Sequence, residues 1–354
     1  MARERLRRIL FPWSHESLLF EVTARCNLAC RHCYNVWKND ATPAAPAELS
    51  TDRMLALIGK AVRESRCRIA TFTGGEPLLR DDLEALVARA AARCDQVNLI
   101  TNGMLLTEGR VRSLLAAGVT LFELPLNSAD RDTHNRMAGS AEAFDAVTRA
   151  AAEIRSQGGE LAFVFVGTKH NIAQWRDAAE LGMALGARNF LFNRYNAGGE
   201  CRGKPEDLLP SVEQVRAGLE AAEELARDHG IGIGVSIPIP PCLIDPKDFP
   251  HLGFGFCAAG TTRAYYTIDP VGNVRPCNHT PRVLGNLFET SLRDLARSPE
   301  MAAFMNARPA FCQGCRLENE CLGGCKAAAE VCQGSLDACD PFLELNRERA
   351  ARPG

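Results

Sequence analysis

The chain has 354 residues, of which 46% are hydrophobic and 24% charged, as is ordinary for a globular protein with room for one large and one smaller domain. A formal net charge of −2 gives no reason to expect nucleic acid or an anionic membrane as a partner. The basic residues 3–8 are not followed by an apolar run of signal-peptide length, and no apolar run reaches about 18 residues, so we expect a cytoplasmic protein without a membrane span.

Short apolar runs alternate with amphipathic stretches from residue 18 to about residue 235. The expected strands are Leu18–Thr23, Ile69–Thr73, Val97–Thr101, Val119–Leu126, Leu161–Val166 and Asn189–Asn193. The expected helices are Thr51–Glu64, Asp81–Arg93, Thr107–Ala117, Ala141–Gln157 and Ala173–Leu185. This alternation predicts βαβ units and a parallel sheet, with the active site at the carboxyl ends of the strands.

Three cysteines, Cys26, Cys30 and Cys33, directly follow the first expected strand. The chain has 15 cysteines, and in a reducing compartment such a number favours metal binding over disulfides. Three thiolates without a fourth nearby suit a [4Fe–4S] cluster that leaves one iron open to a substrate or cofactor. A zinc knuckle or a structural cluster is the alternative.

Further candidate site residues stand at the ends of later strands. Gly74, Gly75, Glu76 and Pro77 follow the second strand, where glycines let the backbone approach a ligand closely and the glutamate adds an acceptor. Asn102 and Asn127 follow the third and fourth strands and can both donate and accept hydrogen bonds. Arg194 ends the sixth strand, where a guanidinium can pair with a carboxylate. A helix-entry turn at Asn102 and a rim salt bridge at Arg194 are equally good interpretations.

The CxxxCxxC spacing of Cys26–Cys33, with the aromatic Tyr34 beside it, resembles the signature of radical S-adenosylmethionine (radical SAM) enzymes. Gly74–Pro77 match the GGEP motif of that family. The resemblance implies a partial (β/α)6 TIM-like barrel and a cluster whose open iron is chelated by SAM. It also implies that SAM is cleaved reductively to a 5′-deoxyadenosyl radical, and that the GGEP segment holds the methionyl ammonium.

The chain departs from this family after the fourth expected strand. Pro125 and Asn127 stand where many relatives carry a serine and an aspartate, and Ala138 stands where an arginine is common. The family's ribose contacts therefore cannot all be transferred. Asn127 and Arg194 are retained as candidate SAM contacts, and His134 is expected to be structural.

Cysteines become frequent after Pro241, and long helical patterns stop. The cysteines of this region that form the pattern are Cys257, Cys277, Cys312, Cys315, Cys321, Cys325 and Cys339. Tyr265–Ile268 and Asn273–Arg275 read as a small β-hairpin. Together these features resemble the SPASM domain, which binds auxiliary iron–sulfur clusters.

The SPASM resemblance implies two auxiliary clusters. A zinc-ribbon module is the alternative, because CxxC pairs suit zinc as well. One cluster would be held by four thiolates, those of Cys312, Cys315, Cys321 and Cys339. The other would be held by Cys257, Cys277 and Cys325, and its fourth position is either an open iron or Cys242. Cys332 competes with Cys339, and Cys67, Cys94 and Cys201 are expected to be buried free cysteines.

The two resemblances predict four segments: residues 1–17, a radical SAM barrel at 18–237, a SPASM domain at 238–345, and a tail at 346–354. They imply an oxidoreductase that abstracts hydrogen from a peptide or protein side chain. Its partners would be an electron donor such as flavodoxin or ferredoxin and, in the absence of its own recognition domain, a separate peptide carrier. The alternatives are a tetrapyrrole or other cofactor precursor as substrate, a non-catalytic iron–sulfur electron-transfer protein, and a zinc-stabilised binding module.

Overall fold

The computed structural model describes residues 15–36, 48–198, 205–261 and 263–350. Its strands are β1 (Ser17–Glu21), β2 (Ile69–Thr73), β3 (Gln96–Ile100), β4 (Leu121–Pro125), β5 (Leu161–Gly167), β6 (Asn189–Arg194), β7 (Gly232–Val235), β8 (Gly253–Phe254), β9 (Tyr265–Ile268), β10 (Asn273–Arg275) and β11 (Gly285–Asn286). Its main helices are α2 (Thr51–Ser65), α3 (Leu83–Ala91), α4 (Glu108–Ala117), α5 (Arg131–Ala138), α6 (Ala143–Ser156), α7 (Trp175–Ala184) and α8 (Val212–His229). Shorter helices follow in the cysteine-rich region, namely α9 (Leu292–Leu295), α10 (Pro299–Asn306), α11 (Glu318–Cys321), α12 (Lys326–Gln333) and α13 (Pro341–Leu345).

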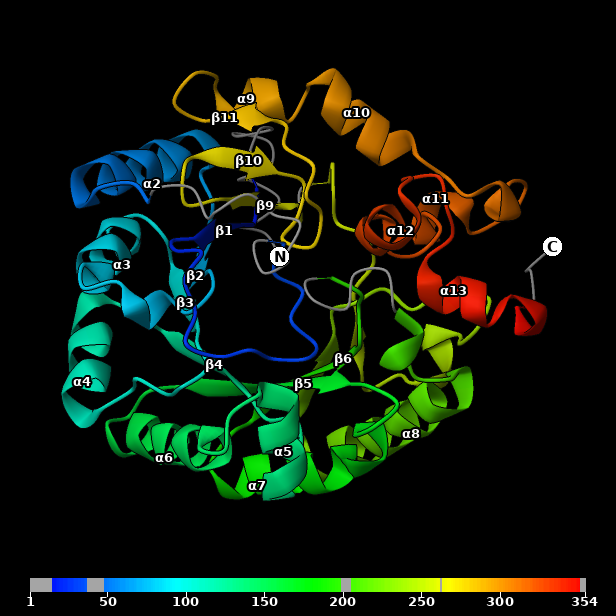
Figure 1. Cartoon of the computed structure of the whole chain (residues 1–354), viewed down its shortest axis with the longest axis horizontal. Helices are drawn as coiled ribbons and strands as arrows, with labels where there is room; N and C mark the ends of the chain where they lie inside the picture. Colours follow the sequence, from blue (N-terminus) through cyan, green and yellow to red (C-terminus); the bar gives the residue numbers. More distant parts are fainter. Residues whose placement is uncertain (1–14, 37–47, 199–204, 262, 351–354) are drawn as a thin grey trace.

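All strands belong to one sheet, in the order β11-β10-β9-β1-β2-β3-β4-β5-β6-β7-β8. Among the described residues, the neighbouring strands from β9 along the sheet to β8 pair in parallel, and β10 pairs antiparallel with both β9 and β11. The sheet curves into an open barrel with α2, α3, α4, α6, α7 and α8 outside it, and α11 to α13 lie beside the gap between β6 and β9 (Figure 1). The expected α/β partial barrel is confirmed.

Two differences from the expected elements affect the site. The predicted hairpin does not stand apart from the barrel: β9 pairs in parallel with β1, with Ser17 opposite Tyr265. The short helix α5, which the sequence analysis did not predict, begins at an Asp130 cap whose side chain accepts a hydrogen bond from the Thr133 N–H at 2.8 Å. Its buried residues are few, so it lacks the long apolar stripe that identifies a helix from sequence.

Strand alternation divides each barrel strand between a core and an interior. On β4, Phe122 and Leu124 are fully buried in the main core. The alternate residues Leu121, Glu123 and Pro125 line cavities inside the barrel. Because successive side chains of a strand point to opposite faces, the barrel interior is the place where polar site residues can gather.

Two buried ion pairs join the barrel to the cysteine-rich region. Glu21 on β1 pairs with Arg275 on β10, and both side chains are 1% exposed. Arg194 at the end of β6 pairs with Asp340, which caps α13, and these side chains are 1% and 0% exposed. A charge left alone at such a depth is costly, so each pair constrains how the two regions sit together.

We predict that Arg275→Met destabilises the protein by about 3–5 kcal/mol, because it leaves the Glu21 carboxylate buried without its partner. Arg68→Met is the control: it breaks the exposed pair with Asp95, whose side chains are 49% and 67% exposed, and should cost less than about 1 kcal/mol. Denaturant unfolding of the anaerobically purified protein measures both. Equal losses for the two variants would contradict the role given to the buried pair.

Candidate cluster and cofactor site

The loop after β1 carries the first three cysteines to the mouth of the barrel. Cys30 and Cys33 line the upper interior cavity, and Cys26 and Cys30 pack against a small apolar cluster that includes Leu28. The Arg31 N–H donates to the Met137 carbonyl in α5 at 3.0 Å, so the unpredicted helix holds this loop. The loop therefore lies at the carboxyl ends of the strands, with Cys30 and Cys33 on the cavity wall.

The GGEP segment after β2 runs directly alongside the cysteine loop. The Gly75 N–H donates to the Thr23 carbonyl at 2.8 Å, and the Glu76 N–H donates to the Arg25 carbonyl at 2.7 Å. A Cβ atom on Gly75 would overlap the Arg25 carbonyl and stand 2.8 Å from the Ala24 oxygen. Glycine is required here because the two backbones approach too closely for a side chain.

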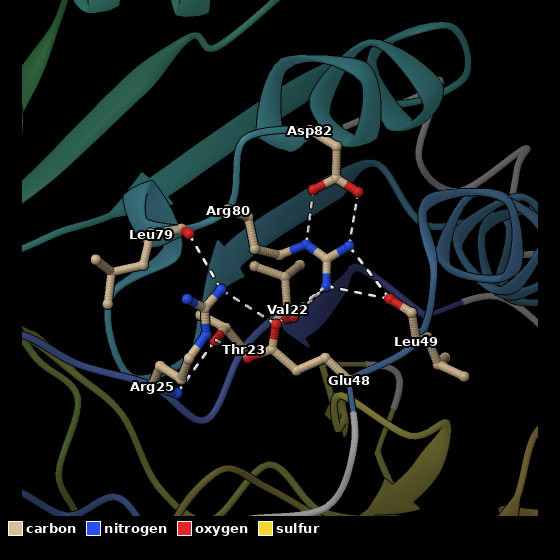
Figure 2. A network of polar contacts seen from close by, with 8 residues as sticks. All are labelled: Val22, Thr23, Arg25, Glu48, Leu49, Leu79, Arg80 and Asp82. Carbon is tan, nitrogen blue, oxygen red and sulfur yellow. Dashed lines mark hydrogen bonds and ion pairs between the residues drawn. The ribbon is translucent and has the colours of Figure 1, made fainter.

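A network of charged side chains lies beside the contact between the cysteine loop and the GGEP segment (Figure 2). Arg25, the residue before the first cysteine, donates to Glu48 at 3.1 Å and to the Leu79 carbonyl at 3.1 Å. Arg80 donates to Asp82 at 2.6 and 2.7 Å and to the Val22 carbonyl at 3.2 Å. The Arg80 hydrogen bonds hold the pKa of Asp82 below its usual value, although partial burial opposes this.

Glu76 connects the second and third loops rather than lining the cavity. Its side chain is 1% exposed. One carboxylate oxygen accepts from the Thr101 hydroxyl at 2.7 Å and the Leu78 N–H at 3.0 Å, and the other accepts from the Asn102 N–H at 2.8 Å. Asn102 in turn donates to Asn27 in the cysteine loop at 2.8 Å. Three loops are thus tied together, and Asn102 itself lines the cavity.

The two other candidate SAM contacts have partners within the protein. The Asn127 side-chain oxygen accepts from the Val166 N–H at 3.1 Å, and the Asn127 backbone N–H donates to Nδ1 of His134 at 3.3 Å. Arg194 borders the cavity, but its guanidinium pairs with Asp340 and donates to the Pro238 carbonyl at 3.0 Å. Of the two interpretations considered for Arg194, the salt bridge is the one present, and it is buried.

The upper cavity encloses about 360 Å³ at the carboxyl ends of the strands. Besides the cysteine loop and Gly74–Gly75, its wall includes Tyr34, Tyr265 and His279. Tyr34 packs on His279 with ring centroids 4.5 Å apart, which links the first cysteine loop to the segment following Cys277. Burial raises the pKa of Tyr34 to about 12, with a further contribution from the Glu21 carboxylate. The phenol is therefore neutral at physiological pH.

One group of C-terminal thiols lies close to this cavity. Burial raises the pKa of the Cys277 thiol to about 12, and the nearby Cys325 and Cys257 sulfurs raise it further. Asn196, which also lines the cavity, donates to the Cys325 sulfur at 3.4 Å. Cys257, Cys277 and Cys325 thus form the group that was expected to hold one auxiliary cluster.

The second group surrounds a small enclosed cavity near α11. This cavity is lined by Cys242, Cys312, Cys315 and Cys321. Burial raises the pKa of Cys312 to about 12, with smaller contributions from Cys321, Cys339 and other neighbouring thiols. Cys242 was expected to be available to the first group, but its electrostatic neighbours are Cys321, Cys315 and Cys339. It lies in the second group because the turn after Pro240 carries it there.

The remaining cysteines lie outside the three groups of thiols described above. Cys67 and Cys94 lie near the amino ends of β2 and β3 and are free cysteines, as expected, with Cys67 buried and Cys94 half-buried. Their sulfur atoms are 3.6 Å apart. Cys332 packs against the main core, and Cys201 lies outside the described residues. Glu123 was missed by the sequence analysis, although a glutamate in the middle of an otherwise apolar strand could have indicated it.

The donor sets fit iron–sulfur clusters by chemistry and position. Thiolates are the ligands that such clusters use, and each group lines or borders a cavity. Within the described ranges, no three His, Cys, Asp or Glu side chains converge as a site for a single metal ion. The groups of thiols are therefore defined by their place in the fold and by the effect of each thiol on the pKa values of its neighbours. Thiols with raised pKa values must release protons when they bind a cluster.

Comparison with known proteins agrees with this arrangement. The model of the radical SAM superfamily matches residues 20–182, and the SPASM iron–sulfur cluster-binding domain matches residues 257–316. The chain belongs to the radical SAM superfamily and carries a SPASM domain. It is a SAM-dependent enzyme with a SAM-binding [4Fe–4S] cluster and auxiliary clusters, which sets aside the electron-transfer and zinc-module alternatives.

Relatives of known name indicate which radical SAM enzymes this chain resembles in sequence. The chain is 30% identical over 338 residues to a PqqA peptide cyclase of Xanthomonas euvesicatoria pv. vesicatoria, covering 93% of this chain and 87% of that protein. It is 29% identical over 336 residues to the PqqA peptide cyclase of Granulibacter bethesdensis, with coverage of 93% and 87%.

Solved structures share the fold. Streptococcus suis SuiB bound to its precursor peptide SuiA superimposes with a TM-score of 0.73 at 16% identity, covering 97% of this chain and 80% of that one. The enzyme anSMEcpe with bound AdoMet gives 0.72 at 18% identity, with coverage of 94% and 95%.

We predict that Gly75→Ala loosens the cysteine loop and lowers the affinity for SAM at least about 10-fold, because the new methyl group must displace the Arg25 carbonyl. Gly109→Ala is a matched control, since a Cβ atom there has open space around it and alanine favours the helix. Equilibrium dialysis with labelled SAM on reconstituted protein measures both affinities. Unchanged binding by the Gly75 variant would contradict the close approach described above.

We predict that Cys339→Ser lowers the iron content by up to about four atoms per chain, whereas Cys332→Ser leaves it unchanged. Cys339 neighbours the second group of thiols, whereas Cys332 packs against the main core. Iron and sulfide analysis after anaerobic reconstitution measures the difference. Loss of iron from the Cys332 variant alone would reverse the assignment.

Proposed function

We propose that this enzyme oxidises a side chain of a small precursor peptide, using SAM as the source of the hydrogen-abstracting radical. The relatives named PqqA peptide cyclase match almost the whole chain, and this supports a peptide rather than a tetrapyrrole as substrate. The cluster that cleaves SAM would be held by Cys26, Cys30 and Cys33. Gly74, Gly75 and Pro77 would shape the SAM site beside Asn102, with Glu76 holding that loop in place.

The observation that carries the proposal is that two thiol groups meet one cavity. Cys30 and Cys33 line it directly, and Asn196 connects its wall to Cys325 of the first auxiliary group. A volume of about 360 Å³ suits a ligand of the size of SAM. The peptide backbone would then remain at the mouth, with a single side chain reaching inward toward both clusters.

The auxiliary clusters would accept the electron that remains after hydrogen abstraction. Cys257, Cys277 and Cys325 would hold one with an open iron, and Cys312, Cys315, Cys321 and Cys339 would hold the other. Asn127 would support the SAM site through its hydrogen bond with β5 rather than by direct contact with SAM. Arg194 would position α13. A flavodoxin or ferredoxin as electron donor, a separate peptide carrier and a cytoplasmic location remain part of the proposal, because free thiols and reduced clusters need a reducing compartment.

The proposal is tested by incubating the anaerobically reconstituted enzyme with SAM, dithionite and a synthetic peptide encoded beside its gene. We expect 5′-deoxyadenosine, together with a peptide that has lost two hydrogen atoms by mass spectrometry. Cys26→Ala with Cys30→Ala and Cys33→Ala should abolish both products while auxiliary iron is retained. If the wild type makes 5′-deoxyadenosine but leaves every such peptide unmodified, the peptide substrate is wrong although the radical chemistry stands.

A further inference from the structure

Glu123 is a carboxylic acid on the inner wall of the barrel. It lies between Phe122 and Leu124, whose side chains point outward into the core. Its own side chain lines the upper cavity, one inward position below Pro125. A charged residue on an inner wall costs free energy unless it is solvated or paired, so its position calls for a functional explanation.

A second cavity, at the opposite end of the barrel, is also lined by Glu123. It encloses about 820 Å³ among the amino ends of the strands, and Glu123 and Leu191 line both cavities. Its wall includes Asp95, Glu160 and His251, whose side chains are 67%, 63% and 49% exposed. Water can therefore approach Glu123 from the lower side, while a ligand occupies the upper side.

Two amide side chains orient the carboxyl group between the cavities. Asn98 on β3 donates to Oε1 of Glu123 at 3.1 Å, and the Gln96 side-chain N–H donates in turn to the Asn98 side-chain oxygen at 2.8 Å, which fixes the Asn98 amide. Gln96 itself lines the lower cavity. Burial raises the pKa of Glu123 to about 7, against the smaller lowering effect of the Asn98 hydrogen bond. A group with this pKa can both take up and release a proton near neutral pH.

Oxidation of a substrate by a radical leaves a proton to be removed. Abstraction of one hydrogen atom forms 5′-deoxyadenosine and a substrate radical. That radical becomes a closed-shell product only when it loses one electron, which an auxiliary cluster accepts, and one proton. The proton needs an acceptor that faces the substrate and can return it to water.

We propose that Glu123 is this acceptor: its carboxylate takes the proton from the substrate in the upper cavity and passes it to water in the lower cavity. The inference rests on the proposed function. The other titratable or charged groups facing the two cavities are Cys30, His32, Cys33, Tyr34, Arg194, Tyr265 and His279 above, and Asp95, Glu160 and His251 below. Among them Glu123 is the carboxylic acid on the substrate side.

The first experiment needs no substrate. Infrared difference spectra of the reconstituted holoenzyme are recorded between pH 5 and 9 to follow the protonated-carboxyl stretch. We expect a band that disappears as the pH rises through about 7, shifts rapidly in D₂O, and is absent from Glu123→Gln. Glu108→Gln, at an exposed position on α4 that lines neither cavity, should keep the band. A wild-type band that the Glu123 variant retains, or no such band at all, would overturn the proposal.

The second experiment uses the gene-adjacent synthetic peptide of the preceding section. In Glu123→Gln the ratio of oxidised peptide to 5′-deoxyadenosine should fall about 100-fold, the usual loss for a missing general base. Glu123→Asp should recover part of the lost ratio, and Glu108→Gln, at an exposed position on α4 that lines neither cavity, should keep the wild-type ratio. A wild type without 5′-deoxyadenosine would refute the proposed function, whereas a Glu123→Gln ratio equal to that of an active wild type would refute this inference alone.

Discussion

The pairing of β9 with β1 is the constraint on which the arrangement of this protein depends. It makes β9, which belongs to the cysteine-rich region, a continuation of the barrel sheet, with Leu18 opposite Tyr266 and Phe20 opposite Ile268. A one-residue slip would turn every side chain of β9 to the other face. Because the first cysteine loop leaves β1 and the segment to Cys277 leaves β9 through β10, this register also sets the spacing of the thiol groups.

Buried charges hold the two regions in that register. Glu21 and Arg275 lie on strands separated by β9, and Arg194 and Asp340 close the other side of the gap. Asp340 also accepts from the Cys325 N–H at 2.8 Å, so the ion pair and a proposed cluster ligand share one carboxylate. Movement of α13 would therefore disturb both. Such pairs add little net stability but penalise alternative packings severely.

The barrel interior holds polar residues among apolar ones, and the outer face of the same strands supplies the core. Phe163, Phe165, Phe190 and Phe192 lie between the sheet and its helices together with Trp175. This packing lets inward positions such as Asn98 and Glu123 remain polar without loss of the fold. The two cavities that these residues line would separate the path of the substrate from the path of a proton.

Local chemistry made much of this predictable from sequence. The β2 bounds agree with the prediction, and the other five strands expected for the barrel differ by only a few residues at either end, because apolar runs and helix caps are local signals. The cysteine spacing and the GGEP segment likewise identified the loops that meet at the site. The grouping of Cys257, Cys277 and Cys325 followed from family resemblance and agrees with their electrostatic proximity.

Long-range contacts decided the rest. The sequence by itself determined which strands, loops and thiols this protein has, since hydrophobic period, glycine and cysteine spacing act over a few residues. Only the tertiary structure decided that Arg194 pairs with Asp340, 146 residues away, that Cys242 joins the second thiol group, and that Glu123 stands between two cavities. The physical reason is that an ion pair or a cavity wall joins segments distant in the chain, and no local pattern records which partner a side chain meets after the sheet has closed.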